Sequence, residues 1–159
     1  MHDAAMVIDQ RARYEELYRT NGAALWRSVL LYAGDPDVAS DAVAEAFAQA
    51  IRRGEDIETP RAWITRAAFR IAAGDLKDRR TRAYPIVDVG YEMPESVAGL
   101  ADALAELSPK QRAAAVLHFR DGYTAAEVAE IIGSTTSAVG VHLHRAKARL
   151  RELLGDDDD

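Results

Sequence analysis

The residues whose types and spacing suggest chemistry most clearly lie between Thr124 and Leu150, near the C-terminal end of the chain. Ala129, Gly133 and Val139 have the spacing of a helix-turn-helix: a small residue where two helices approach, a glycine at the turn and an apolar plug on the second helix. Basic residues follow on that second helix, and a helix of this kind lies in the major groove of DNA. The pattern therefore predicts nucleic-acid binding.

The predicted DNA contacts are residues on the exposed side of the second helix and at its N-terminal end. They are Thr135, Thr136, Ser137, Gly140, Val141, His144, Arg145, Lys147 and Arg149. The first of these also suits the N-cap, because its hydroxyl can accept from otherwise unpaired N–H groups. Residues at the N-terminal end would read base edges, while the cations would bind phosphates. An amphipathic helix pair whose basic end suits the helix dipole is the alternative; spacing and charge together favour DNA binding.

Other kinds of site find little support in the sequence. His142 and His144 are two residues apart, so on a helix they point to different sides, and metal binding is not expected. Cysteine is absent, which removes disulfides, thiolate catalysis and cysteine-bound zinc. Asp41 and Glu45 are four residues apart, but such carboxylates are usually solvated. No phosphate-binding glycine loop and no nucleophile with a matched base is found, so we expect neither an enzyme nor a cofactor.

Charge is distributed in blocks, although the net charge is −6 at pH 7. Asp35–Glu58 has seven acidic and two basic residues, whereas Arg61–Arg82 has seven basic and two acidic ones. Ser108–Leu154 is net basic, and four aspartates end the chain. Alternating blocks suggest one basic partner and one anionic partner. Any single block could equally be a solvated helix face.

The length of 159 residues allows one domain or two small ones. No run of eighteen apolar residues occurs, so no membrane insertion is expected. The first ten residues lack the basic start and apolar core of a signal peptide, which favours a cytoplasmic location.

Helical periodicity dominates the N-terminal half, and no segment alternates as a strand would. The first helix is expected over Asp9–Ala33, with Asn21-Gly22 as a candidate interruption. Its apolar stripe consists of Tyr14, Leu17, Tyr18, Leu25, Val29 and Leu30. A second helix, capped by Asp35 or Asp37, reaches about Arg53. Its expected inward residues are Val38, Ala42, Phe47 and Ile51.

A third helix is expected from Arg61 to about Arg82, opened by Thr59-Pro60, because proline suits the first helical position. Its expected buried side consists of Trp63, Ile64, Ala67, Ile71 and Leu76. Residues 83–100 then contain prolines, glycines and acids, and they predict a flexible acidic linker. Four further helices are expected at 100–107, 109–119, 124–132 and 136–153. We therefore predict an all-α protein of two small helical domains, 1–82 and 101–159, the second ending in the acidic tail.

These residues resemble a known family. The segment from Leu100 to Leu154 resembles the fourth conserved region of extracytoplasmic-function (ECF) RNA polymerase sigma factors. The matching positions are Leu107, Pro109, Gln111-Arg112, Leu117, Gly122, Glu127-Val128-Ala129 and His144-Arg145-Ala146. The N-terminal part resembles the second region of the family. Its matching positions are Tyr14, Leu17-Tyr18, Gly34-Asp35, Asp41, Glu45, Phe47 and Pro60-Arg61-Ala62-Trp63.

The resemblance implies a subunit that directs core RNA polymerase to promoters. The fourth-region domain would read the −35 element and the second-region domain would open the −10 element. It implies polymerase binding by Asp41, Glu45 and Phe47, which fits the acidic block. It implies −10 binding along the third helix, by Arg61, Trp63, Arg66, Arg70, Lys77, Arg79 and Arg80. For Trp63 a core role is favoured over base stacking.

Some positions depart from the family pattern. Ala44 stands where glutamine is frequent, Arg70 where asparagine is frequent, and Gly140 where a lysine or arginine usually follows the buried valine. Gly74 falls inside the third helix. These departures leave the promoter preference open. They also leave room for a sigma-like DNA-binding regulator without initiation activity. An anti-sigma factor is a candidate further partner, which the residues do not identify.

Overall fold

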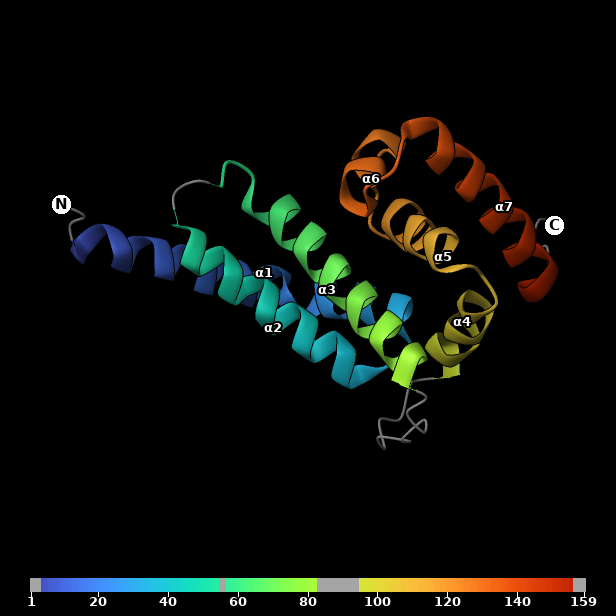
Figure 1. Ribbon diagram of the computed structural model, residues 1–159, viewed down its shortest axis with the longest axis horizontal. Helices are drawn as coiled ribbons and strands as arrows, with labels where there is room; N and C mark the ends of the chain where they lie inside the picture. The colour runs from blue at the N-terminus through green and yellow to red at the C-terminus, as the bar shows by residue number, and fades with distance from the viewer. Residues whose placement is uncertain (1–3, 55–56, 83–94, 156–159) are drawn as a thin grey trace.

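The computed structural model describes the backbone of residues 4–54, 57–82 and 95–155. It describes side chains for residues 9–54, 57–78 and 99–155. Every regular element in these ranges is helical, which confirms the all-α prediction for the described residues (Figure 1). The elements are α1 Ala4–Ala33, α2 Pro36–Arg53, α3 Pro60–Arg82, α4 Glu95–Ala105, α5 Pro109–Ala115, the π-helical turn η2 Val116–Arg120, α6 Ala125–Ile132 and α7 Thr136–Leu154.

The first three helices pack into an N-terminal unit. Gly34, at a φ of 71°, ends α1, and the Asp35 side chain caps α2 by accepting hydrogen bonds from the backbone N–H groups of Asp37 and Val38. Ala42, Ala46 and Ala50, one turn apart on α2, are fully buried and let the helices approach closely. Larger side chains fill the space between the helices, among them Tyr14, Val29 and Ile64.

Three expectations about this unit are wrong. First, α1 runs unbroken through Asn21-Gly22. Second, Tyr18 is 56% exposed, and its ring lies over Gly22, where a Cβ would come within 3.3 Å of it. Third, Ile51 is 42% exposed because it follows buried Ala50 by one residue, which turns it about 100° away from the core.

The C-terminal unit consists of α5, η2, α6 and α7. Capping boxes open α5 and α6: Ser108 with Gln111, and Thr124 with Glu127. The helix predicted over 109–119 is α-helical only to Ala115 and continues as η2, in which the Asp121 N–H donates to the Val116 carbonyl over 3.2 Å. The α7 helix packs against both α5 and α6.

The predicted linker is shorter than expected at its C-terminal side. Residues 95–100 belong to α4 instead, because Pro94 precedes a helix-compatible run that begins with an acidic residue, which suits a helix N-terminus. The remaining linker residues, 83–94, and the aspartate tail, 156–159, lie outside the described residues.

The two helical units pack directly against each other. In Figure 1, α3 runs beside the C-terminal helices, and contacts join α3 to α6 and α1 to α4, α5 and η2. Buried side chains of both units form one continuous core. Within the described residues, no helix is long and apolar enough to cross a membrane.

Candidate nucleic-acid interface

The turn between α6 and α7 has the predicted helix-turn-helix geometry. Gly133 adopts φ 67° and ψ 46°, in the left-handed region, and its N–H caps α6 by donating to the Ala129 carbonyl. Val128 and Val139 are fully buried where the two helices meet. The Thr135 hydroxyl accepts from the Ala138 N–H over 3.1 Å, which confirms its predicted role as the N-cap of α7.

The outer face of α7 is accessible from its first residue onward. Val139 and Ala146 anchor the helix inward, with Leu143 and Leu150 packed against the core. All nine predicted DNA contacts are exposed: Thr135, Thr136, Ser137, Gly140, Val141, His144, Arg145, Lys147 and Arg149. Val141 is 48% exposed, which leaves an apolar group available for a thymine methyl.

Arg149 differs from its neighbours on α7. Its guanidinium pairs with the Glu152 carboxylate at 2.9 Å and with the Glu106 carboxylate, after the end of α4, at 3.6 Å. All three side chains are about half exposed or more, so these pairs are weak and a phosphate could replace them. The pair with Glu106 therefore links α7 to the residue that follows α4 without adding much stability.

The two histidines of α7 lie in different surroundings. His144 is exposed, whereas the Nδ1 atom of half-buried His142 is enclosed without a hydrogen-bond partner among the described residues. The described chain contains no group of three His, Asp or Glu residues able to hold a metal ion. Nothing in the structure explains the enclosed Nδ1 atom.

The α3 helix carries a second cationic surface. Arg61, Arg66, Arg70 and Lys77 are exposed. Trp63 is partly buried and packs against the core, in keeping with the core role favoured for it. Arg79 and Arg80 are in the last turns of α3, and their side chains lie outside the described set.

A cavity of about 640 Å³ lies between α3 and the C-terminal unit. Arg66, Arg70 and Lys77 line it from α3, opposite Lys110 and Ile132 from α5 and α6. This cationic cavity is separate from the α7 surface, so the structure does not bring the two predicted DNA-binding sets into one site.

The acidic face of α2 is only partly as expected. Asp41 and Glu45 are exposed, but Phe47 is only 7% exposed and its ring packs edge-on against Tyr18 with centroids 5.1 Å apart. Glu45 accepts hydrogen bonds from Arg52 over 2.9 Å and from Gln49 over 3.2 Å. These bonds, that of Arg52 first, hold the pKa of Glu45 below its ordinary value.

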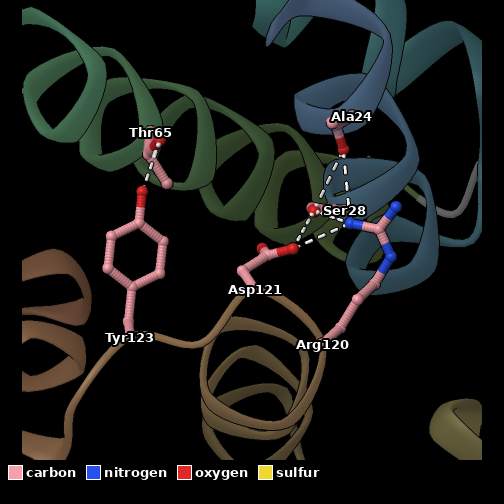
Figure 2. A network of polar contacts seen from close by, with 6 residues as sticks. All are labelled: Ala24, Ser28, Thr65, Arg120, Asp121 and Tyr123. Atoms are coloured by element: carbon pink, nitrogen blue, oxygen red, sulfur yellow. Dashed lines mark hydrogen bonds and ion pairs between the residues drawn. The ribbon is translucent and has the colours of Figure 1, made fainter.

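Six polar residues between the units were not singled out as site residues. They are Ser28, Thr65, Arg112, Arg120, Asp121 and Tyr123. Figure 2 shows all of them except Arg112, together with the backbone of Ala24. Of these, only Arg112 matched a position of the family pattern. Ser28 and Thr65 gave no signal, because small hydroxyl residues inside a helix are common and their burial depends on the packing of distant segments.

Comparison with known proteins places this geometry among transcription proteins. Residues 98–150 match the family model described as Sigma-70, region 4. The RNA polymerase sigma-E factor of Streptomyces coelicolor is 33% identical over 151 residues, covering 89% of this chain and 85% of that protein. The ECF RNA polymerase sigma factor SigM of Mycobacterium tuberculosis is 30% identical over 163 residues, covering 96% of this chain and 82% of that protein.

Two solved structures have a similar fold. CnrH, solved in complex with the cytosolic domain of CnrY, aligns with a TM-score of 0.73 and 23% identity, covering 98% of this chain and 96% of CnrH. The sigma factor RpoE of Bartonella quintana, solved with the anti-sigma factor NepR, aligns with a TM-score of 0.76 and 21% identity, covering 91% and 98%. At these identities the likeness supports the arrangement of the helices.

Proposed function

This chain belongs to the ECF family of RNA polymerase sigma factors, and we propose that separate helix surfaces of the chain bind promoter DNA and core polymerase. It binds core RNA polymerase and directs transcription initiation at promoters with −35 and −10 elements. The relationship over nearly the full length of both chains, 85% of the S. coelicolor sigma-E factor, carries this conclusion. A helix-turn-helix alone would not distinguish an initiation factor from a repressor.

The α7 helix is proposed to read the −35 element in the major groove. Its N-terminal residues, from Thr135 to Val141, would face base edges, and Arg145, Lys147 and Arg149 would bind phosphates. Three features support this assignment: the exposed outer face of α7, its N-cap Thr135, and the turn at Gly133 that precedes it. Gly140 offers no side chain where a cation is frequent in the family, which removes one contact.

The cations of α3 are proposed to bind the opened −10 strand. Arg61, Arg66, Arg70 and Lys77 are exposed along one helix, and Arg79 and Arg80 extend the run. Single strands bind such cationic surfaces through their phosphates. Trp63 packs against the core and would hold α3 in position.

The exposed carboxylates of α2 are proposed to bind a basic surface of core polymerase. Asp41 and Glu45 would make the contact, and opposite charges would steer the encounter. Buried Phe47 supports the helix from beneath, through its packing with Tyr18.

The partners are therefore core polymerase and promoter DNA. RNA synthesis stays with the polymerase, so the chain itself is proposed to be a non-enzymatic, cytoplasmic subunit. The B. quintana RpoE structure holds an anti-sigma factor. By analogy, we include such a protein among the candidate partners of this chain.

Run-off transcription tests the proposal. Purified chain is added to core polymerase on genomic DNA fragments, and transcript starts are sequenced. We expect starts that depend on the chain and share two upstream elements. A chain that neither binds core polymerase nor supports initiation would contradict the proposal, and tight binding to duplex DNA without initiation would instead identify a plain regulator.

A further inference from the structure

The cavity between α3 and the C-terminal unit combines an apolar wall with cations. Its volume of about 640 Å³ lies within the range of about 300–1,000 Å³ that small-molecule sites usually have. Phe69, Ala73 and Leu76 line it from α3, and Ile132 lines it from α6. Lys110, on α5, adds a cation that the proposed DNA surfaces do not use. The cavity therefore offers both apolar contact and positive charge to a single ligand.

The α3 helix presents these two kinds of side chain next to each other. Phe69, Ala73 and Leu76 recur at helical spacing and form one apolar stripe. Arg70 follows Phe69 by one residue and Lys77 follows Leu76 by one, so each cation is turned about 100° around the helix from its apolar neighbour. From Phe69 to Lys77 the helix rises about 12 Å. An extended hydrocarbon chain along the stripe would thus have a cation beside it at either end.

Three cations of the cavity have no anionic partner among the described residues. Arg66, Arg70 and Lys110 are exposed, and their side chains form no ion pair or hydrogen bond with that part of the chain. Arg52 and Arg149, by contrast, pair with carboxylates of their own helices. Cations that converge on a cleft with apolar walls attract anions, because the walls focus the field.

The lining is poorly suited to sugars and nucleobases. Among the described residues that line the cavity, none carries a carboxylate or a side-chain amide, and Tyr32 has the one side-chain hydroxyl. Sugars and bases carry several hydrogen-bond donors, and a buried donor without an acceptor costs affinity. A hydrocarbon chain needs no hydrogen bond, and its burial against apolar side chains is favourable in itself. The lining therefore favours an acyl chain with an anionic end.

The size of the cavity also argues against a protein helix as its occupant. A helix with its side chains is about 10–12 Å wide. A space of about 640 Å³ with that cross-section is only about 7 Å long, little more than one helical turn. A single hydrocarbon chain is much narrower, so it can contact the apolar stripe of α3 over its full length.

We propose that this cavity is a binding site for a single-chain anionic amphiphile. The acyl chain packs against Phe69, Ala73 and Leu76, and its carboxylate or phosphate head group binds Arg70 and Lys110, since both head groups accept charge-assisted hydrogen bonds. A regulatory consequence rests on the function proposed above, in which Arg70 binds the −10 strand. The bound amphiphile occupies that cation and lowers initiation, while the α7 surface stays available to the −35 duplex.

Calorimetric titration of the free chain tests the site. The probes are dodecanoate, dodecyl phosphate and dodecyltrimethylammonium, each below its micelle concentration, which share one hydrocarbon chain and differ in the charge of the head group. We expect one anionic probe to bind per chain, with an affinity at least about tenfold above that of the cationic probe. The tighter of the two anions identifies the head group. Equal affinity for the cationic probe, or binding of many molecules per chain, would overturn the proposal.

Two variants locate the bound probe. Ala73→Phe fills the cavity from an exposed position of α3, and Lys110→Ala removes one cation. Each should lower the affinity for dodecanoate by about tenfold. Ala23→Phe and Arg13→Ala, at exposed positions of α1 outside the cavity, are the matched controls and should leave the affinity unchanged. Circular dichroism checks the folding of each variant, and Lys110→Ala alone decides if the added ring unfolds the chain. Wild-type affinity in the folded cavity variants would overturn the proposal.

Run-off transcription tests the consequence for initiation. At a dodecanoate concentration of about ten times its dissociation constant, transcript starts should fall about tenfold, as the unoccupied fraction does. With Ala73→Phe, the same addition should change the number of starts little, and binding of the −35 duplex should not respond in either protein. Equal initiation with and without dodecanoate would overturn the regulatory role. If the chain initiates under neither condition, the proposed function fails, and calorimetry still decides whether the site exists.

Discussion

Single residues on α7, the helix proposed to bind the −35 element, are expected to divide into two kinds. Arg145 is an exposed cation in the C-terminal half of α7, whereas Ser137 is an exposed hydroxyl in its first turn. Phosphate contacts carry no sequence information, while contacts to base edges do. Removing Arg145 and removing Ser137 should therefore change DNA binding in different ways.

Arg145→Ala should weaken binding to all promoter duplexes alike and lower the dependence of affinity on salt by about one released counterion. Ser137→Ala should instead change the ranking of duplexes, by about 1–3 kcal/mol at one base pair. Binding is measured by fluorescence anisotropy over a salt series on single-base variants of a mapped −35 element. A uniform loss for Ser137→Ala would show that this residue reads no base.

The carboxylate of Glu45 gives a prediction at the same scale. The hydrogen bond from Arg52 is the main cause of its lowered pKa, so Arg52→Ala should raise the pKa of Glu45 towards the ordinary value. A carboxyl group with a depressed folded-state pKa stabilises the fold above its unfolded pKa, and this contribution is lost as pH falls through the folded pKa. An NMR titration of the side-chain carboxyl measures the change.

Arg19→Ala is the matched control for that titration. It removes the arginine of a comparable exposed pair, Arg19 with Glu16, from a different helix. The pKa of Glu45 should not respond to it. A pKa that stays low in Arg52→Ala would show that Gln49 alone sustains the shift.

At the scale of elements, the turn between α6 and α7 depends on the backbone of one glycine. Gly133 has a φ of 67°, and a Cβ there would meet nothing within 4 Å, so the cost of a side chain is purely conformational. Gly140, in the middle of α7, has equally open surroundings but a helical backbone. The same substitution should therefore have opposite signs at the two positions.

Gly133→Ala should lower the free energy of unfolding by about 1–2 kcal/mol, because L-residues are strained in the left-handed region. Gly140→Ala should raise it by about 1 kcal/mol, because alanine loses less backbone entropy in a helix. Urea denaturation with a constant m-value measures both. If both substitutions lowered the free energy of unfolding, steric crowding by the added methyl group, rather than backbone conformation, would be the cause.

At the scale of the whole molecule, the packed units should unfold together. One continuous core runs through both, so urea should produce a single transition. The two tryptophans, Trp26 and Trp63, lie in the N-terminal unit, so their fluorescence reports on that unit alone, whereas far-UV circular dichroism reports on all helices. The two curves should coincide for the wild type, and separate midpoints would show that the units are energetically independent.

Much of the architecture could be predicted from local patterns. Gly133, Thr135 and Val139 predicted the turn, the cap and the plug correctly, because each depends on residues within a few positions along the chain. Asp35 was one of two predicted caps for α2 and is the one observed. The exposure of Tyr18 and Ile51 was missed, since a periodic stripe shows which side of a helix is apolar but not where its packing partner ends.

The sequence by itself therefore determined the helices, the helix-turn-helix and the family, because short-range spacing and residue type encode them. Only the tertiary structure decided that the two units close on each other, and that Ser28 meets Asp121, 93 positions away along the chain. The physical reason is that a polar contact between distant segments produces no periodic pattern in the sequence. A buried serine cannot be distinguished from an exposed one until the segment that covers it is known.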